Sequence, residues 1–238
     1  MARSETLLRQ DGFGIFAHRQ DSPAQTLIIT FGDISSSLTE RGFGTDWALK
    51  LGHDTVYVAQ ARRSQYQHLS RETFARTLAP LAAGYDRVVC YGSSVGGYCA
   101  FYFGGAIRSE ILAAAPRLPR HPILNAPRSR DLPFLHEEFL PPPEGDCIPL
   151  VILDPLTLLD ARFLFQYAGP RYPKMHLCPI PGAGHLVLKR MAEAGVLSRL
   201  LPPMVEGRMN SLPRWAKLRL QAHLAQADGM ADEAEESA

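Results

Sequence analysis

The sequence lacks long apolar runs, an excess of charge of either sign, and paired cysteines, and each absence excludes a class of protein. A membrane-spanning helix needs an apolar stretch of about 18 residues, and no stretch in this sequence is that long. The 25 lysines and arginines nearly balance the 24 aspartates and glutamates, for a formal net charge of +1. Bulk charge therefore gives no reason to expect nucleic acid or a membrane surface as a partner. Because the N-terminal residues contain no apolar signal-peptide segment, we expect a cytoplasmic protein.

The four cysteines have no spacing that indicates a disulfide framework or a metal site. None belongs to a C-x-x-C pair, and most lie in apolar surroundings typical of strands and helices. We therefore expect buried, reduced thiols, and neither a metal nor a cofactor. The residues concerned are Cys90, Cys99, Cys147 and Cys178.

Short apolar segments alternate with helical segments along most of the chain. With 238 residues, 46% of them hydrophobic, the chain is long enough to bury one sizeable core. One helix is expected to begin after Ser70 as its N-cap, and another to run over residues 186–200. The expected strands are residues 14–17, 26–31, 55–59, 88–91, 111–115, 150–153 and 175–180. This alternation predicts an α/β fold with a parallel, doubly wound sheet.

Composition divides the chain into one domain and a C-terminal extension. Residues 1–207 form the predicted α/β domain, and the proline-rich segment 117–146 is either a lid or a rigid connector. Residues 208–227 include a basic amphipathic helix, which we expect to pack on its own domain. Residues 228–238 form an acidic tail that we expect to be disordered.

The stretch Gly92-Ser93-Ser94-Val95-Gly96 fits the pattern G-x-S-x-G with Ser94 at its centre. An apolar strand precedes it and a segment of small residues follows, so the expected order is strand, sharp turn, helix. The glycines two residues before and after Ser94 allow backbone to pack where a Cβ would not fit. This context favours Ser94 as a nucleophile.

A serine nucleophile requires a base and an acid from elsewhere in the chain. Of the eight histidines, only His185 lies in a glycine-rich loop directly after a predicted strand. Asp154 ends an apolar strand, where an unpaired carboxylate is costly to bury, and we favour it as the acid. Asp160, six residues later, is the alternate acid, although an aspartate there could also cap a helix.

With these residues in the order serine, acid, histidine, the chain resembles the α/β-hydrolase superfamily over roughly residues 12–200. The resemblance implies a mostly parallel central sheet with helices on both faces and no large cap domain. It also implies an oxyanion hole formed by the backbone N–H of Val95 and, in the loop after the strand 26–31, that of Asp33. This loop contains Phe31-Gly32 where the superfamily often has His-Gly.

The function that this constellation predicts is hydrolysis of an ester or thioester through an acyl-enzyme on Ser94. Arg62, Arg63 and Tyr66, on a loop at the same edge of the sheet, could hold an anionic or sugar substrate, although surface arginines are more often only solvated. A weak similarity of this loop to hydrolase-like proteins of bacterial polysaccharide pathways suggests an acyl group on a glycan. The substrate is thus a small molecule or a glycan acyl ester. The alternatives are an acyltransferase or deacylase acting on glycans, and a non-catalytic binding protein on the same scaffold.

Overall fold

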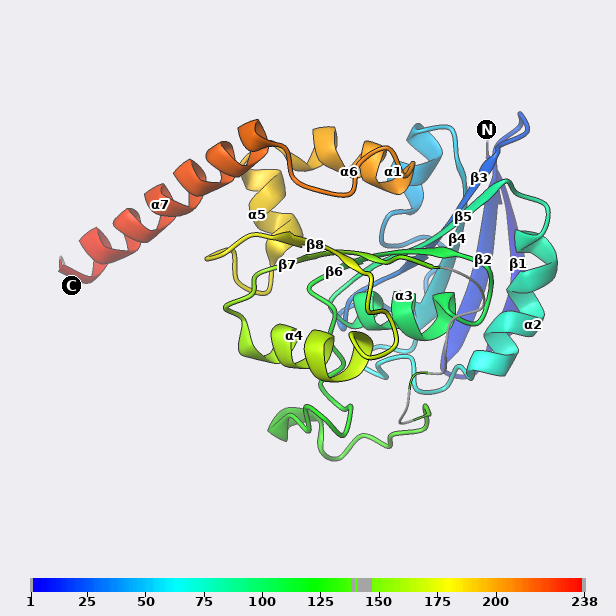
Figure 1. The fold of residues 1–238 in the computed structure, drawn as a ribbon. Helices are drawn as coiled ribbons and strands as arrows, with labels where there is room; N and C mark the ends of the chain where they lie inside the picture. Colours follow the sequence, from blue (N-terminus) through cyan, green and yellow to red (C-terminus); the bar gives the residue numbers. More distant parts are fainter. Residues whose placement is uncertain (1, 138–139, 141–146, 237–238) are drawn as a thin grey trace.

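A twisted sheet of eight strands organises the residues that the computed structural model describes, which are 2–137, 140 and 147–236 (Figure 1). The strands lie in the order β1-β2-β4-β3-β5-β6-β7-β8. From β4 to β8 all neighbouring strands are parallel, and only β2 pairs antiparallel, with β1 and with β4. The prediction of a mostly parallel sheet is confirmed. Their bounds are β1 Arg3–Gln10, β2 Phe13–Arg19, β3 Thr26–Phe31, β4 Asp54–Gln60, β5 Arg87–Ser93, β6 Glu110–Ala114, β7 Leu150–Leu153 and β8 His176–Pro179.

Strand β1 is the strand that the sequence did not predict. Its residues are mostly exposed and polar, so it shows neither the apolar run of a buried strand nor a clear alternation. It forms because it pairs with β2 at the edge of the sheet, from Arg3 opposite Arg19 to Gln10 opposite Phe13.

Helices cover both faces of the sheet (Figure 1). The core on one face includes apolar side chains of α2, α3 and α4, and the core on the other includes those of α1, α5, α6 and α7. At the start of α2, the Thr73 N–H donates to the Ser70 hydroxyl oxygen over 3.1 Å, as expected of an N-cap. The bounds are α1 Thr45–Lys50, α2 Arg71–Ala82, α3 Val95–Gly104, α4 Leu158–Phe163, α5 Val187–Glu193, α6 Leu197–Val205 and α7 Arg214–Glu236, with a 3-10 turn at Pro127–Ser129 and a π-helical turn at Leu164–Ala168.

The C-terminal part differs from the prediction in two places. The expected helix over residues 186–200 is two helices, because Gly195 adopts a φ of 67° after α5 and the chain turns before α6. Helix α7 packs on the domain through the buried residues Ala216 and Leu220, but it continues to Glu236. It therefore extends past the predicted end of this segment at residue 227, and the disorder expected of residues 228–238 stays a prediction.

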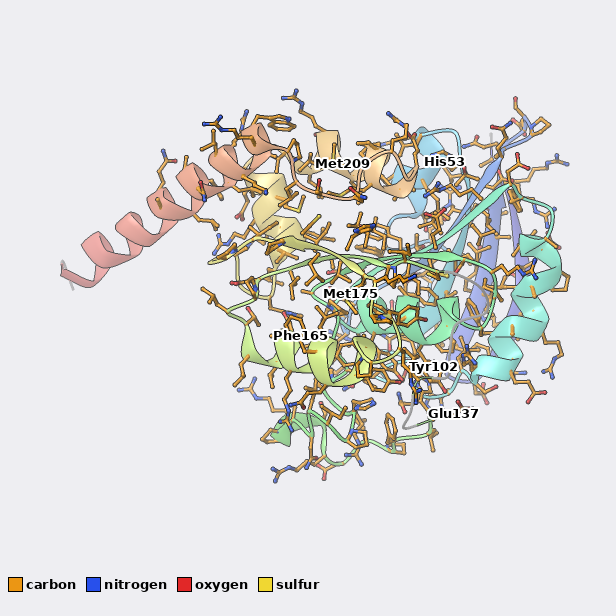
Figure 2. All side chains as sticks on the ribbon, viewed as in Figure 1. His53, Tyr102, Glu137, Phe165, Met175 and Met209 are labelled. Atoms are coloured by element: carbon orange, nitrogen blue, oxygen red, sulfur yellow. The ribbon has the colours of Figure 1, made fainter. Side chains whose placement is uncertain are left out.

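One end of the described part of the proline-rich segment packs against α3. His136 is buried between Tyr98 and Tyr102 of α3 and the 66–69 loop, whose Tyr66 carbonyl accepts from its Nε2 over 2.8 Å. Burial lowers the pKa of His136 to about 4. The backbone N–H of Glu137 donates to the Tyr102 hydroxyl, and the two residues lie close together in Figure 2. Residues 138–139 and 141–146 of this segment lie outside the described residues.

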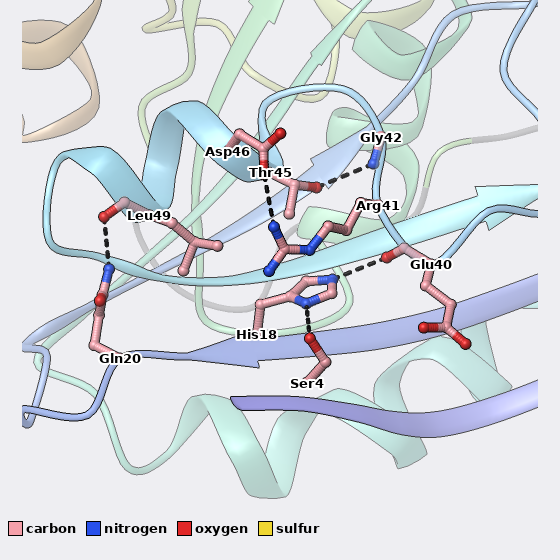
Figure 3. A network of polar contacts seen from close by, with 9 residues as sticks. All are labelled: Ser4, His18, Gln20, Glu40, Arg41, Gly42, Thr45, Asp46 and Leu49. Atoms are coloured by element: carbon pink, nitrogen blue, oxygen red, sulfur yellow. Dashed lines mark hydrogen bonds and ion pairs between the residues drawn. The ribbon is translucent and has the colours of Figure 1, made fainter. Parts of the chain in front are cut away.

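The loop between β3 and α1 is held on the sheet by polar contacts (Figure 3). His18 of β2 contacts the Ser4 hydroxyl and the Glu40 carbonyl, both over 2.8 Å. Within the loop and α1, Arg41 donates to Asp46 over 2.9 Å. These contacts fix a loop that begins at Gly32, where the oxyanion hole is expected.

All four cysteines are free, and three of them are buried. Among the described helices, none has the length and apolarity needed to cross a lipid bilayer.

Candidate active site

Ser94 lies on a sharp turn between β5 and α3, which we call the elbow. Its backbone has a conformation that residues other than glycine rarely adopt. Its φ is 57° and its ψ is −120°. A Cβ on Gly92 would lie 2.1 Å from the carbonyl oxygen of Gly96, and a Cβ on Gly96 would lie 2.2 Å from that of Phe31. Both distances are far below contact, so the turn can form only with glycine at these positions.

Backbone hydrogen bonds from β6 and the segment after it fix Ser94 further. The Ser94 N–H donates to the Ala114 carbonyl over 2.9 Å, and the Arg117 N–H donates to the Ser94 carbonyl over 3.1 Å. A Cβ on Gly97 would lie 3.0 Å from the Cα of Pro116, so the glycine directly after the motif lets this segment approach α3.

The imidazole of His185 lies between the Ser94 hydroxyl and the carboxylate of Asp160. Nε2 is 2.8 Å from the Ser94 Oγ, and Nδ1 is 2.8 Å from the Asp160 Oδ2. A carboxylate only accepts, so Nδ1 carries the proton and Nε2 is left to accept from the hydroxyl. The side chain of Asp160 is fully buried, while that of His185 is 18% exposed. The imidazole ring is therefore accessible to solvent, and the carboxylate is not.

The carboxylate beside His185 is thus the alternate residue, Asp160, and not the favoured Asp154. Asp154 does end β7 and is buried, but its two oxygens accept the backbone N–H groups of Leu156 and Gly184 over 2.9 and 2.7 Å. These bonds compensate its burial and hold the loop before His185. Asp160 reaches the ring because α4 starts at Leu158 and places it in the first turn.

The two predicted oxyanion donors come from adjacent segments. Val95 is the first residue of α3, where backbone N–H groups have no partner within the helix. Asp33 follows the Phe31-Gly32 backbone against which Gly96 packs. The Asp33 carboxylate accepts from the N–H and the hydroxyl of Ser35, over 2.8 and 2.6 Å, and is thereby bound within its own turn. Its charge is thus partly compensated by Ser35.

Tyr66 does not face a substrate, contrary to the prediction. It is fully buried, and its hydroxyl lies 3.2 Å from the carbonyl oxygens of Gly32 and Val58. Burial raises the pKa of Tyr66 well above its usual range, so the hydroxyl remains a donor. A trans peptide directs its C=O and N–H to opposite sides, so this contact turns the Asp33 N–H away from Tyr66. The tyrosine therefore packs behind the loop in which the oxyanion hole is predicted.

Arg62 and Arg63 are exposed on the loop after β4, and no ion pair or hydrogen bond of their side chains occurs among the described contacts. Among the described residues, neither arginine has a hydrogen bond or ion pair with His185 or Asp160. Their part in holding a substrate stays a prediction.

Two residues of the site were missed by the sequence analysis. Gln60, at the end of β4, donates to the Asp33 carbonyl over 2.8 Å and accepts from the Tyr66 N–H over 3.0 Å. Arg117 forms an ion pair with Asp160, with 3.4 Å between Nη1 and Oδ1. Both are polar residues at or just after the carboxyl end of a strand, and that position was the available signal.

No family model and no curated protein matches the sequence. Solved structures do match in fold. A putative carboxylesterase from Lactobacillus plantarum is 14% identical with a TM-score of 0.51, over 87% of this chain and 97% of that one. The mouse alpha/beta hydrolase domain-containing protein 10 is 13% identical with a TM-score of 0.52, over 87% of this chain and 100% of that one. The chain has the α/β-hydrolase fold.

The α/β-hydrolase fold also relates the chain to part of a larger protein. A chain of the glycosylation-associated Gap123 complex from Streptococcus agalactiae is 13% identical with a TM-score of 0.56, over 82% of this chain. The present chain spans only 45% of the length of that protein. At such identities the likeness is one of fold.

The close approach of Gly96 to the Phe31 carbonyl oxygen predicts that Gly96→Ala destabilises this domain. Its Cβ would overlap a backbone oxygen, so we expect a loss of about 1–3 kcal/mol or more in the free energy of unfolding. Urea denaturation of the purified variant measures it. Gly84→Ala is the matched control, since its Cβ would meet only the Leu81 carbonyl oxygen at 3.4 Å. Equal midpoints for both variants would contradict the steric account.

Proposed function

We propose that the protein is a serine hydrolase that cleaves an ester or thioester of an apolar acyl group through an acyl-enzyme on Ser94. The observation that carries the proposal is the position of the His185 ring, 2.8 Å from the Ser94 hydroxyl and 2.8 Å from the Asp160 carboxylate. The fold supports the hydrolase class, and the contacts of the side chains support the serine mechanism.

In the proposed reaction, the Ser94 oxygen attacks the carbonyl carbon while Nε2 of His185 takes its proton. The N–H groups of Val95 and Asp33 stabilise the negative charge on the carbonyl oxygen. The tetrahedral intermediate collapses, the leaving group takes the proton from Nε2, and the acyl group stays on Ser94. Water then attacks the carbonyl carbon of the acyl-enzyme while Nε2 of His185 takes a proton from it. The bond to Ser94 breaks, the Ser94 oxygen takes the proton from Nε2, and the carboxylic acid product is released. Asp160 keeps the proton on Nδ1 and stabilises the ring while it is charged.

Exposed apolar side chains on the segments around the site support an apolar acyl group as the substrate. Ile34 follows Asp33, Leu156 and Leu158 lie between Asp154 and Asp160, and Leu186 follows His185. They are 37%, 75%, 75% and 58% exposed, respectively. All four lie at the carboxyl end of the sheet, where Ser94 also lies, three of them in loops and Leu158 at the start of α4. We call them the apolar rim, and an acyl chain laid across it would remove apolar surface from water.

Ser94→Ala is expected to abolish covalent labelling by a fluorophosphonate probe, because the probe reacts only with an activated serine. Hydrolysis of p-nitrophenyl esters is expected to fall by roughly 10⁴-fold or more in Ser94→Ala and in His185→Ala. Labelling that persists in Ser94→Ala would refute the assignment of the nucleophile. Equal ester hydrolysis in wild type and His185→Ala would instead favour a binding protein on the hydrolase scaffold.

The two carboxylates at the end of β7 are expected to respond differently to conversion to an amide. Asp160→Asn should lower kcat by roughly 10⁴-fold, because an amide can donate to Nδ1 and so favours the wrong tautomer of His185. Asp154→Asn keeps one acceptor for the loop N–H groups, so its loss in kcat should be far smaller. Steady-state kinetics of both variants tests this, and a larger loss in Asp154→Asn would restore Asp154 as the acid.

The apolar rim predicts a preference for long acyl chains that depends on its leucines. In the double variant Leu158→Ser, Leu186→Ser, kcat/KM for p-nitrophenyl octanoate should fall roughly tenfold, equivalent to about 1.4 kcal/mol, with little change for the acetate. Leu218→Ser on α7, where the leucine is 55% exposed, is the matched control. If octanoate and acetate lose the same factor, the rim does not bind the acyl chain.

A further inference from the structure

Arg117 joins the two halves of the site through its backbone. It follows β6 after Ala115, whose φ of 43° turns the chain and whose N–H donates to the Ile152 carbonyl of β7 over 2.7 Å. The Arg117 N–H then donates to the carbonyl of Ser94 over 3.1 Å. The backbone of residues 115–117 is therefore bonded both to Ser94 and to β7, the strand that precedes Asp160.

The side chain of Arg117 extends to the acid itself. Its Nη1 lies 3.4 Å from the Oδ1 of Asp160, while Oδ2 of the same carboxylate accepts from His185. Among the described residues, no hydrogen bond is made to Oδ1 of Asp160. The Arg117 guanidinium is therefore the group that compensates the negative charge on this oxygen. The Asp160 side chain is fully buried, and a buried carboxylate without a partner is strongly unfavourable. The Arg117 side chain is 22% exposed.

We propose that Arg117 is a positioning residue that holds Asp160 charged and oriented toward His185, and thereby sets the lower limit of the pH range in which His185 acts as a base. The inference rests on the proposed function, since it assigns a role beside the same three residues. It explains why a cation from the proline-rich segment lies against the carboxylate that contacts the ring.

The sign of the pH effect follows from the charges. His185 is a base only while its ring is neutral, and activity is lost as acid protonates it. The positive charge of Arg117 opposes a second positive charge on the nearby ring and partly neutralises Asp160, which would stabilise that charge. Removal of Arg117 should therefore let the ring become protonated at a higher pH.

Among the described residues, the carboxylates and cations of the neighbouring loops, α4 and α5 have other partners. Asp154 accepts from the Leu156 and Gly184 N–H groups, and Asp33 from Ser35. Arg162 of α4 donates to Gln166, and Lys189 and Arg190 of α5 pair with Glu193. Arg117 is thus the cation among these groups that is paired with the acid.

The test is the pH dependence of kcat/KM for p-nitrophenyl acetate in Arg117→Met, Arg117→Gln and Arg117→Lys. The acid limb is the fall in kcat/KM toward low pH. We expect it to move about one pH unit toward higher pH in the two neutral variants. In Arg117→Lys it should stay near that of wild type. Arg120→Met is the control, since Arg120 belongs to the same segment but donates to the Leu132 carbonyl. Its limb should not move.

An unchanged acid limb in Arg117→Met and Arg117→Gln would overturn the proposal, as would an equal shift in Arg120→Met or in Arg117→Lys. Proton NMR of the His185 Nδ1–H, which needs no substrate, provides a second readout of ring protonation in each variant. If the wild type neither labels with fluorophosphonate nor cleaves esters, the proposed function fails. The NMR midpoints then still decide whether Arg117 controls the charge of the ring.

Discussion

The close approach of backbone at the elbow is the constraint on which the site depends. Gly96 lies so near the carbonyl oxygen of Phe31 that no side chain fits between them. This contact places the first turn of α3 against the loop after β3, and so brings Val95 and Asp33 to the same place as Ser94. The strained φ of Ser94 is maintained because hydrogen bonds from both sides of the turn fix its N–H and its carbonyl.

The second constraint is the burial of charge at the end of β7. Two aspartates six residues apart are both removed from water, and each must find partners there. Asp154 finds backbone N–H groups and so fixes the loop before His185, whereas Asp160 finds the His185 ring and Arg117. Asp154 thus stabilises the loop that contains His185, and Asp160 contacts the imidazole of that histidine.

The proline-rich segment connects these features to the rest of the domain. Its first residue, Arg117, pairs with Asp160, and its described end packs under α3 through His136. Tyr98 donates to Nδ1 of His136 over 2.9 Å, and the lowered pKa of that ring keeps it neutral, so this anchor is an uncharged part of the core. The segment therefore contacts the site through Arg117 and the core beside α3 through His136.

Local patterns in the sequence determined much of this protein. The apolar segments predicted the parallel strands, the cap at Ser70 predicted the start of α2, and the glycines around Ser94 predicted a sharp turn, since each depends on neighbours in sequence. Only the tertiary structure showed that Asp160, and not Asp154, contacts His185, because both occupy the expected loop and the contact depends on where α4 begins. It also showed that Tyr66 is buried behind Gly32 and that Arg117 pairs with Asp160. Such contacts join residues dozens of positions apart, and no local pattern records them.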